Sequence, residues 1–225
     1  MGDDRDAVLG VPFSTVPMQF ADREDAGRRL AKRLSHYAGK PDTLVVALPR
    51  GGVVVGREVA DALRLALDIV VPRKIGSPGD PEYAIGAVTE TGEPVWNERE
   101  RERADPSYID AAVGRELAEA RRRLETYRAG FPPRLFRGIT VIVVDDGVAT
   151  GYTMRAALAT VKRERPAAVI VAVPVCPPDS RAVLEAEADE VVVLETPKMF
   201  GAIGAYYENF PQVDDATVIK LLRRQ

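Results

Sequence analysis

The feature that most constrains this chain is an apolar run that ends in two acids and is followed by a glycine-containing loop. The four residues Val141–Val144 are typical of a strand buried on both faces, as in a parallel sheet covered by helices. Asp145 and Asp146 follow directly, and apolar residues recur at helical spacing from Met154 onward. The order strand, acids, loop and helix predicts one unit of an α/β fold, with its loop at the carboxyl end of the strand.

Similar units recur along the chain. Short apolar runs alternate with helical patterns, as expected of a parallel sheet with helices on its faces. The five predicted strands lie at residues 43–48, 67–71, 139–144, 168–173 and 190–194. With 225 residues and 46% hydrophobic content, the chain is long enough for one substantial core. We therefore expect a doubly wound, mainly parallel α/β sheet in a single domain over residues 1–225, with a core at about 43–200, a loose arm at 1–20 and a helix capped by Asp22.

The loop between the acids and the helix has the composition of a phosphate site. Gly147 and Gly151 let the backbone close around an anion, and Thr150 and Thr153 add hydroxyl donors. The amides and the positive dipole end at the start of the next helix favour negative charge. A carboxylate beside such a pocket can accept hydrogen bonds from sugar hydroxyls or help to hold Mg²⁺. The arrangement predicts a phosphorylated sugar whose hydroxyls face the acids.

Other doubly wound proteins also end a buried strand in two acids, at Walker-B-like or Mg²⁺ sites. The sequence contains no Gly-x-x-x-x-Gly-Lys-Ser/Thr, which disfavours a P-loop nucleotide site. It contains no Gly-x-Gly-x-x-Gly either, so the dinucleotide-binding fingerprint is missing. A sugar phosphate remains the favoured ligand.

The stretch Val141–Thr153 resembles the signature of type I phosphoribosyltransferases: four apolar residues, two acids, a short loop and Thr-Gly-x-Thr. Gly147 departs from it, because an apolar residue is more usual there. The resemblance implies that the stretch binds 5-phosphoribosyl 1-pyrophosphate (PRPP). Asp145 and Asp146 would take the ribose hydroxyls and hold Mg²⁺, directly or through those hydroxyls or water. The 5′-phosphate would be cradled by Gly147, Val148, Ala149, Thr150, Gly151, Tyr152 and Thr153.

The strand at 43–48 runs into a second glycine loop, Pro49–Gly52. This loop resembles the pyrophosphate loop of the same family, which implies that Arg50 and the amides of Gly51 and Gly52 bind the diphosphate. The resemblance also implies a non-proline cis peptide near Arg50–Gly51. An ordinary tight turn is the alternative interpretation.

A basic pair, Arg73 and Lys74, follows the strand at 67–71. At the carboxyl end of a parallel strand, these residues would face the same crevice as the two loops. In the family a basic residue at this place offsets the charge of the leaving pyrophosphate, and Lys74 is the stronger candidate for that role. The alternative is a solvated charge at a loop entrance. The expected catalytic set is Asp145, Asp146, Lys74 and Arg50.

Residues 76–107 occupy the place of the mobile flap that closes over the reacting groups in this family. The segment contains a predicted hairpin, Tyr83–Val88 with Pro94–Trp96. Glu82 and Glu90 lie in it, and either could reach a bound base. A lid here would keep water from an oxocarbenium-like centre.

Residues 195–212 take the place of the family's hood, which sandwiches the acceptor base. Phe200, Tyr206 and Tyr207 could stack on a planar base, and Glu208 could approach the metal–diphosphate. Aromatic residues in a C-terminal segment also plug the core in many proteins, so this second role stays open.

Composition excludes several classes of function. The net charge of −3, from 31 basic and 34 acidic residues, gives no sign of a nucleic-acid partner. No apolar run approaches the roughly 20 residues that span a bilayer, so no membrane partner is expected. Cys176 and His36 are each the only residue of their kind, which excludes disulfide frameworks, cysteine-rich zinc sites and a histidine triad within one chain. We expect Cys176 to be inert and the protein to be cytoplasmic.

The resemblance implies a Mg²⁺-dependent phosphoribosyltransferase that uses PRPP and a small-molecule nitrogen acceptor, such as a nucleobase of purine salvage. Oxopurine-using relatives carry an acid at the position of Ala149, and alanine here is similar to adenine-using relatives. The alternative is a PRPP- or nucleotide-sensing regulator with little turnover. A PRPP synthetase would require an ATP site that the sequence does not show. The apolar stripe of a long predicted helix at 105–130 could serve the core or a homodimer contact.

Overall fold

The computed structural model describes residues 20–81, 83–128, 130–133 and 135–224. Most of the arm expected at 1–20 lies outside these residues. Phe20 belongs to the core, because its side chain is only 2% exposed and its backbone bridges to Tyr207. Helix α1 (Arg23–Arg33) begins shortly afterwards, and the expected cap is confirmed: Asp22 Oδ1 accepts from the N–H of Asp25 at 2.7 Å.

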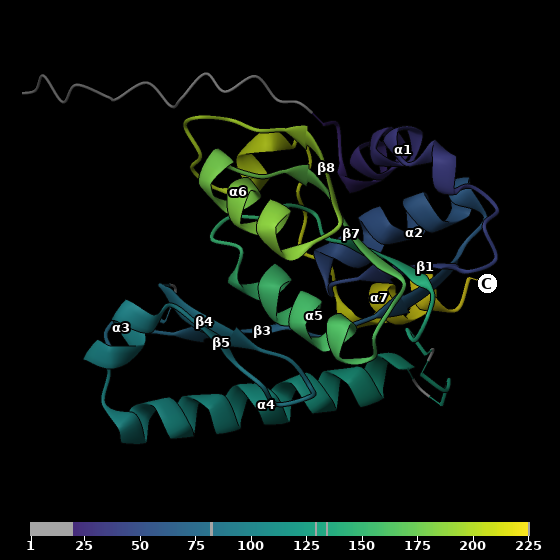
Figure 1. The fold of residues 1–225 in the computed structure, drawn as a ribbon. Coiled ribbons are helices and arrows are strands. Elements are labelled where there is room, and N and C mark those ends of the chain that lie inside the picture. Colours follow the sequence, from purple (N-terminus) through teal and green to yellow (C-terminus); the bar gives the residue numbers. More distant parts are fainter. Residues whose placement is uncertain (1–19, 82, 129, 134, 225) are drawn as a thin grey trace, which may run out of the picture.

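A five-stranded parallel sheet forms the centre of the fold (Figure 1). Its strand order is β2-β1-β6-β7-β8, and every neighbouring pair is parallel. The strands are β1 (Thr43–Ala47), β2 (Ala66–Ile69), β6 (Thr140–Val144), β7 (Ala168–Val175) and β8 (Glu190–Glu195). The predicted doubly wound, mainly parallel α/β fold is confirmed. The strand ends differ slightly from prediction, since β2 stops two residues early and β7 runs two residues further.

Helices cover both faces of this sheet (Figure 1). Val45 and Ile142 share a core with α1, α2 and α7, whereas Val141 and Val143 share one with α5 and α6. Because side chains alternate along a strand, a strand covered on both faces is apolar at every position, which explains the unbroken apolar runs. Besides α1, the helices are α2 (Gly51–Leu63), α3 (Glu98–Arg103), α4 (Pro106–Arg128), α5 (Tyr152–Arg163), α6 (Pro178–Glu187) and α7 (Asp215–Leu222), with 3₁₀ turns η1 (Ser35–Tyr37) and η2 (Ile203–Tyr206). Among the described helices, none combines the length and apolar character that a bilayer span requires.

A second, antiparallel sheet lies over α4 and consists of β3 (Arg73–Gly76), β4 (Ala84–Val88) and β5 (Val95–Trp96). The hairpin predicted from β4 and β5 is present. From the sequence, Arg73 and Lys74 were expected directly after the strand at 67–71, at the carboxyl end of the main sheet, and the structure corrects this expectation. Ile75 is fully buried with residues of β4 and α4, so the segment turns away from the main sheet to form a strand of its own.

The strand order reverses direction between β1 and β6. From β1 the chain moves to β2 at one edge, and it later returns to β6 on the other side of β1. In open α/β sheets, ligands bind outside the carboxyl ends of the strands at such a switch point. The two glycine loops singled out in the sequence begin there, after Ala47 of β1 and Val144 of β6, which are partners in the register.

We predict that Gly27→Ala destabilises the protein. A Cβ at this position of α1 would lie 2.6 Å from Glu58 Cβ and 2.8 Å from the Val55 oxygen, both in α2. Alanine is the better helix former by about 1 kcal/mol, but overpacking costs about 1–3 kcal/mol. Chemical denaturation should therefore show a net loss of stability.

Gly114→Ala in α4 is the matched control, because a Cβ there has no atom within 4 Å. It should stabilise by about 0.5–1 kcal/mol. A Gly27→Ala protein as stable as the Gly114→Ala protein would contradict the close packing of α1 on α2.

Candidate active site

The acid pair lies at the switch point, directly after the last residue of β6. The N–H of Leu48 donates to the Val144 oxygen at 2.9 Å, which holds the ends of β1 and β6 together. Asp145 and Asp146 are half-buried, and the N–H of Asp146 donates to Asp145 Oδ1 at 2.8 Å. The acids therefore stand at the mouth of the crevice that the fold provides.

The first turn of α2 approaches these carboxylates so closely that only glycine fits. A Cβ on Gly51 would overlap Asp146 Oδ2, and one on Gly52 would lie 2.7 Å from Asp145 Oδ1. The glycines of the Pro49–Gly52 loop are thus required by the acids next to them. The structure brings together the predicted diphosphate loop and the predicted ribose acids.

The loop contains a non-proline cis peptide at Pro49–Arg50, one bond before the expected place. The side chain of Arg50 reaches α7, where its Nη1 lies 3.6 Å from Asp215 Oδ1. Tyr127 of α4 donates its hydroxyl to the same oxygen at 2.8 Å. Arg50 is therefore held by an acid that a more strongly charged anion could replace.

The loop after the acids is anchored at two points and open between them. The N–H of Val148 donates to the Val175 oxygen at 2.9 Å, and Ser180 Oγ donates to the Ala149 oxygen at 2.5 Å. Ala149 and Thr150 are exposed. Gly151 has a φ of +82°, a conformation that favours glycine. The anchors fix the loop while its tip faces outward.

Helix α5 begins directly after this loop, and no side chain caps its first turn. Its orphan N–H groups and the positive end of its dipole are therefore available to an anion. Thr153, in the first turn, is half-buried, and Met154 faces the core. The geometry suits a phosphate group seated on residues 147–153.

Gly147, the departure from the family signature, has a structural cause. A Cβ there would lie 2.7 Å from Ile203 Cγ2 and 2.9 Å from Val175 Cγ1. The space that an apolar side chain would fill at this position is occupied here by Ile203 of the C-terminal segment.

One residue of the site, Arg23, was not predicted from the sequence. Its Nε lies 2.7 Å from Asp146 Oδ2, and the side chains are only 8% and 13% exposed. Burial raises the pKa of Asp146, and the Arg23 guanidinium opposes that rise. Burial also raises the pKa of Asp145 well above its usual range, with a further contribution from the charge of Asp146. Arg23 precedes Asp146 by 123 positions, so no local motif could reveal the pair.

The comparisons with known proteins decide the family. The family described as "Phosphoribosyl transferase domain" matches residues 19–210. The chain belongs to the phosphoribosyltransferase family. The family match and the parallel α/β fold agree with the type I family that the signature implied.

Two known proteins are similar to this chain over most of its length. The chain is 42% identical over 207 residues to "Putative phosphoribosyl transferase Rv0571c" of Mycobacterium tuberculosis, a match that covers 91% of this chain and 46% of that protein. It is 46% identical to TT1426 from Thermus thermophilus, with a TM-score of 0.76 over 91% of this chain and 98% of the other. The chain thus spans about half the length of the curated relatives it matches.

The basic pair predicted for this phosphoribosyltransferase-family site lies on β3. Arg73 is bound to α4, because its Nη2 lies 2.9 Å from Glu116 Oε2. Lys74 is half-buried and pairs in register with Ala87 of β4. The structure thus places both cations on the second sheet, and it engages Arg73 with α4.

The aromatic residues predicted to stack on a base form a core cluster instead. Tyr206 and Tyr207 are only 2% and 4% exposed. Tyr206 donates its hydroxyl to the Met199 oxygen at 3.1 Å, and Tyr207 donates to the Asp146 oxygen at 2.5 Å. Phe200, which is partly exposed, stacks on Tyr206 at 5.6 Å. The two tyrosines therefore follow the core-plugging alternative, and Tyr207 supports the acid pair from behind.

The three acids proposed near the base and the diphosphate have different positions. Glu90 accepts from the N–H of Val71 at 3.1 Å, and burial raises the pKa of its carboxyl. Glu208 is exposed, and its backbone N–H donates to the Phe20 oxygen. Glu82 lies outside the described residues. Glu90 therefore joins the end of β2 to the hairpin.

A protein-only metal site is not found in the described part of the chain. No group of three or more His, Cys, Asp or Glu residues there could hold a metal ion. Mg²⁺ is commonly held by one or two carboxylates together with substrate phosphates, and the adjacent Asp145 and Asp146 fit that mode. The donor set is compatible with a metal that arrives with its ligand.

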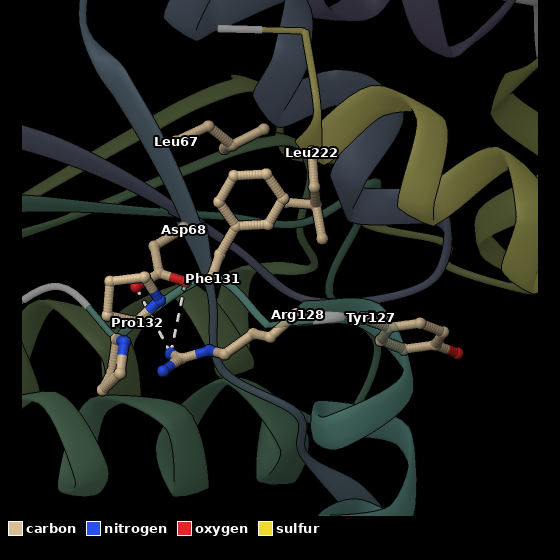
Figure 2. Close-up of a pocket in the computed structure, with 8 residues that line it drawn as sticks. Leu67, Asp68, Tyr127, Arg128, Phe131, Pro132 and Leu222 are labelled. Atoms are coloured by element: carbon tan, nitrogen blue, oxygen red, sulfur yellow. Dashed lines mark hydrogen bonds and ion pairs between the residues drawn. The ribbon is translucent and has the colours of Figure 1, made fainter.

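A cavity of about 230 Å³ lies elsewhere, between β2, the end of α4 and α7 (Figure 2). Figure 2 shows Asp68 and Arg128 side by side in its lining, with Arg128 Nη2 3.2 Å from Asp68 Oδ1. Its lining residues are Leu67, Asp68, Tyr127, Arg128, Phe131, Pro132, Pro133 and Leu222. None of them belongs to either glycine loop, so we locate the site by the loops and acids and not by this cavity.

We predict that Cys176 reacts slowly with thiol reagents in the folded protein. Its side chain is 0% exposed, and burial raises its pKa to about 11. Little thiolate is then present at pH 8, so alkylation should be about 100-fold slower than in denaturant. Because Cys176 is the only cysteine, mass spectrometry reports this thiol alone. Equal rates in the two conditions would contradict its burial.

Proposed function

We propose that the chain transfers the 5-phosphoribosyl group from PRPP to a nitrogen acceptor and releases pyrophosphate. One observation supports this above the others: two glycine loops converge on adjacent carboxylates at the switch point of the sheet. One loop precedes an uncapped helix of 12 residues, and the other carries Arg50. PRPP has a phosphate, vicinal hydroxyls and a diphosphate, and this arrangement offers a partner to each.

The 5′-phosphate would sit on residues 147–153, where the open loop tip and the α5 amides supply donors. The diphosphate would take Arg50 and the amides of Gly51 and Gly52. Arg50 now faces Asp215 at 3.6 Å, a distance at which the ion pair is weak, and both side chains are more than a third exposed. A diphosphate could therefore replace Asp215 at little cost. Lys74, on β3, is the cation proposed to approach from the second sheet.

Mg²⁺ would be held by the diphosphate oxygens with Asp145 or Asp146 as an additional ligand, directly or through water or the ribose hydroxyls, and would offset the charge of the leaving group. The protein residues act mainly by position. As the bond from C1 to the diphosphate breaks, positive charge develops on the ribose next to the acid pair. An acceptor nitrogen then forms the new bond to C1 from the opposite face, and its proton passes to solvent or to the departing diphosphate. Ala149 favours an adenine-like acceptor over an oxopurine.

A PRPP- or nucleotide-binding protein with little turnover is the second candidate. It is favoured by the burial of Tyr206 and Tyr207, which removes two of the three side chains expected to stack on an acceptor base. The phosphate and diphosphate subsites would be the same in both cases. The candidates differ only in whether an acceptor binds productively.

A base panel separates the two functions. The purified protein is mixed with PRPP, Mg²⁺ and each of several purines, pyrimidines and pyridines, and pyrophosphate release is measured. Release that depends on one particular base supports the transferase. Tight PRPP binding by calorimetry with no release for any base supports the sensor, and an absence of PRPP binding contradicts both.

We predict that Asp145→Asn lowers PRPP-dependent kcat/KM about 100-fold without unfolding the protein. Burial raises the pKa of this carboxyl, so its ionised form is disfavoured in the folded state. Ionisation of Asp145 therefore lowers the free energy of unfolding as the pH rises above the pKa that this carboxyl has in the unfolded chain. The asparagine amide does not ionise, so it removes that penalty. At pH 7 the thermal unfolding midpoint of the Asp145→Asn protein should be equal to or higher than that of the unmutated protein. The difference should shrink toward pH 4.

The control is Asp110→Asn, which changes an exposed acid on α4 and should alter neither quantity. Full activity of the Asp145→Asn protein would remove Asp145 from the site. A large fall in its thermal midpoint would show that the carboxylate has a stabilising partner.

A further inference from the structure

The side chain of Arg23 makes three different contacts at once. Its Nε donates to Asp146 Oδ2 at 2.7 Å, and its Nη1 donates to the Pro211 oxygen at 2.7 Å. The guanidinium carbon lies 3.6 Å from the centre of the Phe210 ring. Only 8% of the side chain is exposed. A planar guanidinium can make both hydrogen bonds and stack on the ring at the same time, whereas a lysine ammonium cannot make all three contacts.

These contacts enclose one of the two acids. Asp146 Oδ2 lies between Arg23 and the backbone of Gly51, where a Cβ would overlap it. Its main-chain oxygen accepts from the Tyr207 hydroxyl. Asp146 is thus fixed from α1, from α2 and from the C-terminal segment.

The other acid has a different environment. Among the residues that the structure describes, no cation lies within ion-pair distance of Asp145, and its Oδ1 accepts from the N–H of Asp146. The adjacent acids are therefore unequal: Asp146 is paired with a buried guanidinium, and Asp145 is not.

We propose that Arg23 is a positioning residue that anchors the Asp146 carboxylate in the place from which the acid pair meets the sugar hydroxyls. This assignment rests on the proposed binding of PRPP and names the residue that orients one of its acids. Arg23 also fastens the segment around Phe210 and Pro211 to the acid pair, so the C-terminal segment and the ribose site are held by one guanidinium.

A double-mutant cycle tests the assignment, with PRPP–Mg²⁺ affinity measured by calorimetry and stability by thermal unfolding. Arg23→Met should weaken PRPP binding about tenfold, because the orphaned Asp146 moves. It should also lower the unfolding midpoint by about 10 °C, because it leaves a buried charge unpaired. In the Asp146→Asn background, the same change should alter affinity less than about twofold and should raise the midpoint. In the Asp145→Asn background, the tenfold loss should remain.

Arg29→Met is the matched control on the same helix. Arg29 also pairs with an acid, Asp25, at 2.8 Å, but half of its side chain is exposed. The substitution should change neither PRPP affinity nor the midpoint by a measurable amount. If the Arg23→Met protein does not fold, the Arg23→Lys protein replaces it in the test. Lysine retains a cation, so this variant should recover part of the loss in PRPP affinity and part of the loss in the unfolding midpoint.

Two results would overturn the assignment. If Arg23→Met weakens PRPP binding equally in the unmutated protein and in the Asp146→Asn protein, Arg23 acts through Phe210 and Pro211 alone. A large loss from Asp146→Asn, with none from Arg23→Met, would mean that the Asp146 carboxylate keeps its place without the guanidinium. In either case the unmutated protein still binds PRPP. A failure of the unmutated protein to bind PRPP would instead overturn the proposed function together with this assignment.

Discussion

The arrangement of this site depends on the placement of two neighbouring carboxylates at a half-buried position. Burial of a carboxylate is costly unless hydrogen bonds or a cation compensate. Here the backbone N–H of Asp146 donates a hydrogen bond to the Asp145 carboxylate, and the guanidinium of Arg23 forms an ion pair with Asp146. The glycines that open α2 are a consequence of the same placement, since any Cβ on Gly51 would displace the Asp146 carboxylate. The parallel register of β1 on β6 brings all of these groups to one edge.

Local patterns were sufficient to predict the main sheet and the two loops. Each central strand is covered on both faces, so its sequence is apolar at every position and stands out from the helices around it. The acids and glycines follow their strands directly, and a parallel sheet brings strand ends together. Val144 and Ala47 are in register, so the loops that follow them had to be neighbours once the topology was known.

The parts that were missed depend on contacts between residues far apart in the chain. Arg23 looks like an ordinary charge on an amphipathic helix until the fold brings Asp146 to it. Residues 73–76 contain two cations and a glycine, and only the burial of Ile75 against β4 and α4 makes them a strand. Tyr206 and Tyr207 have the composition of a base platform, but Phe20 and Phe210, at opposite ends of the described chain, pack on Tyr207.

The site is therefore assembled from three regions of the chain and not from the central sheet alone. Helix α1 supplies Arg23, the ends of β1 and β6 supply the glycine loops and the acid pair, and the segment from Ile203 to Asp215 closes around them. Gly147 shows how closely these regions depend on one another, because Ile203 fills the space that a side chain at 147 would take. A substitution in the C-terminal segment can consequently change the acid pair without touching either glycine loop. The acid pair thus depends for its geometry on Arg23 and Tyr207, which lie far from it in the sequence on either side.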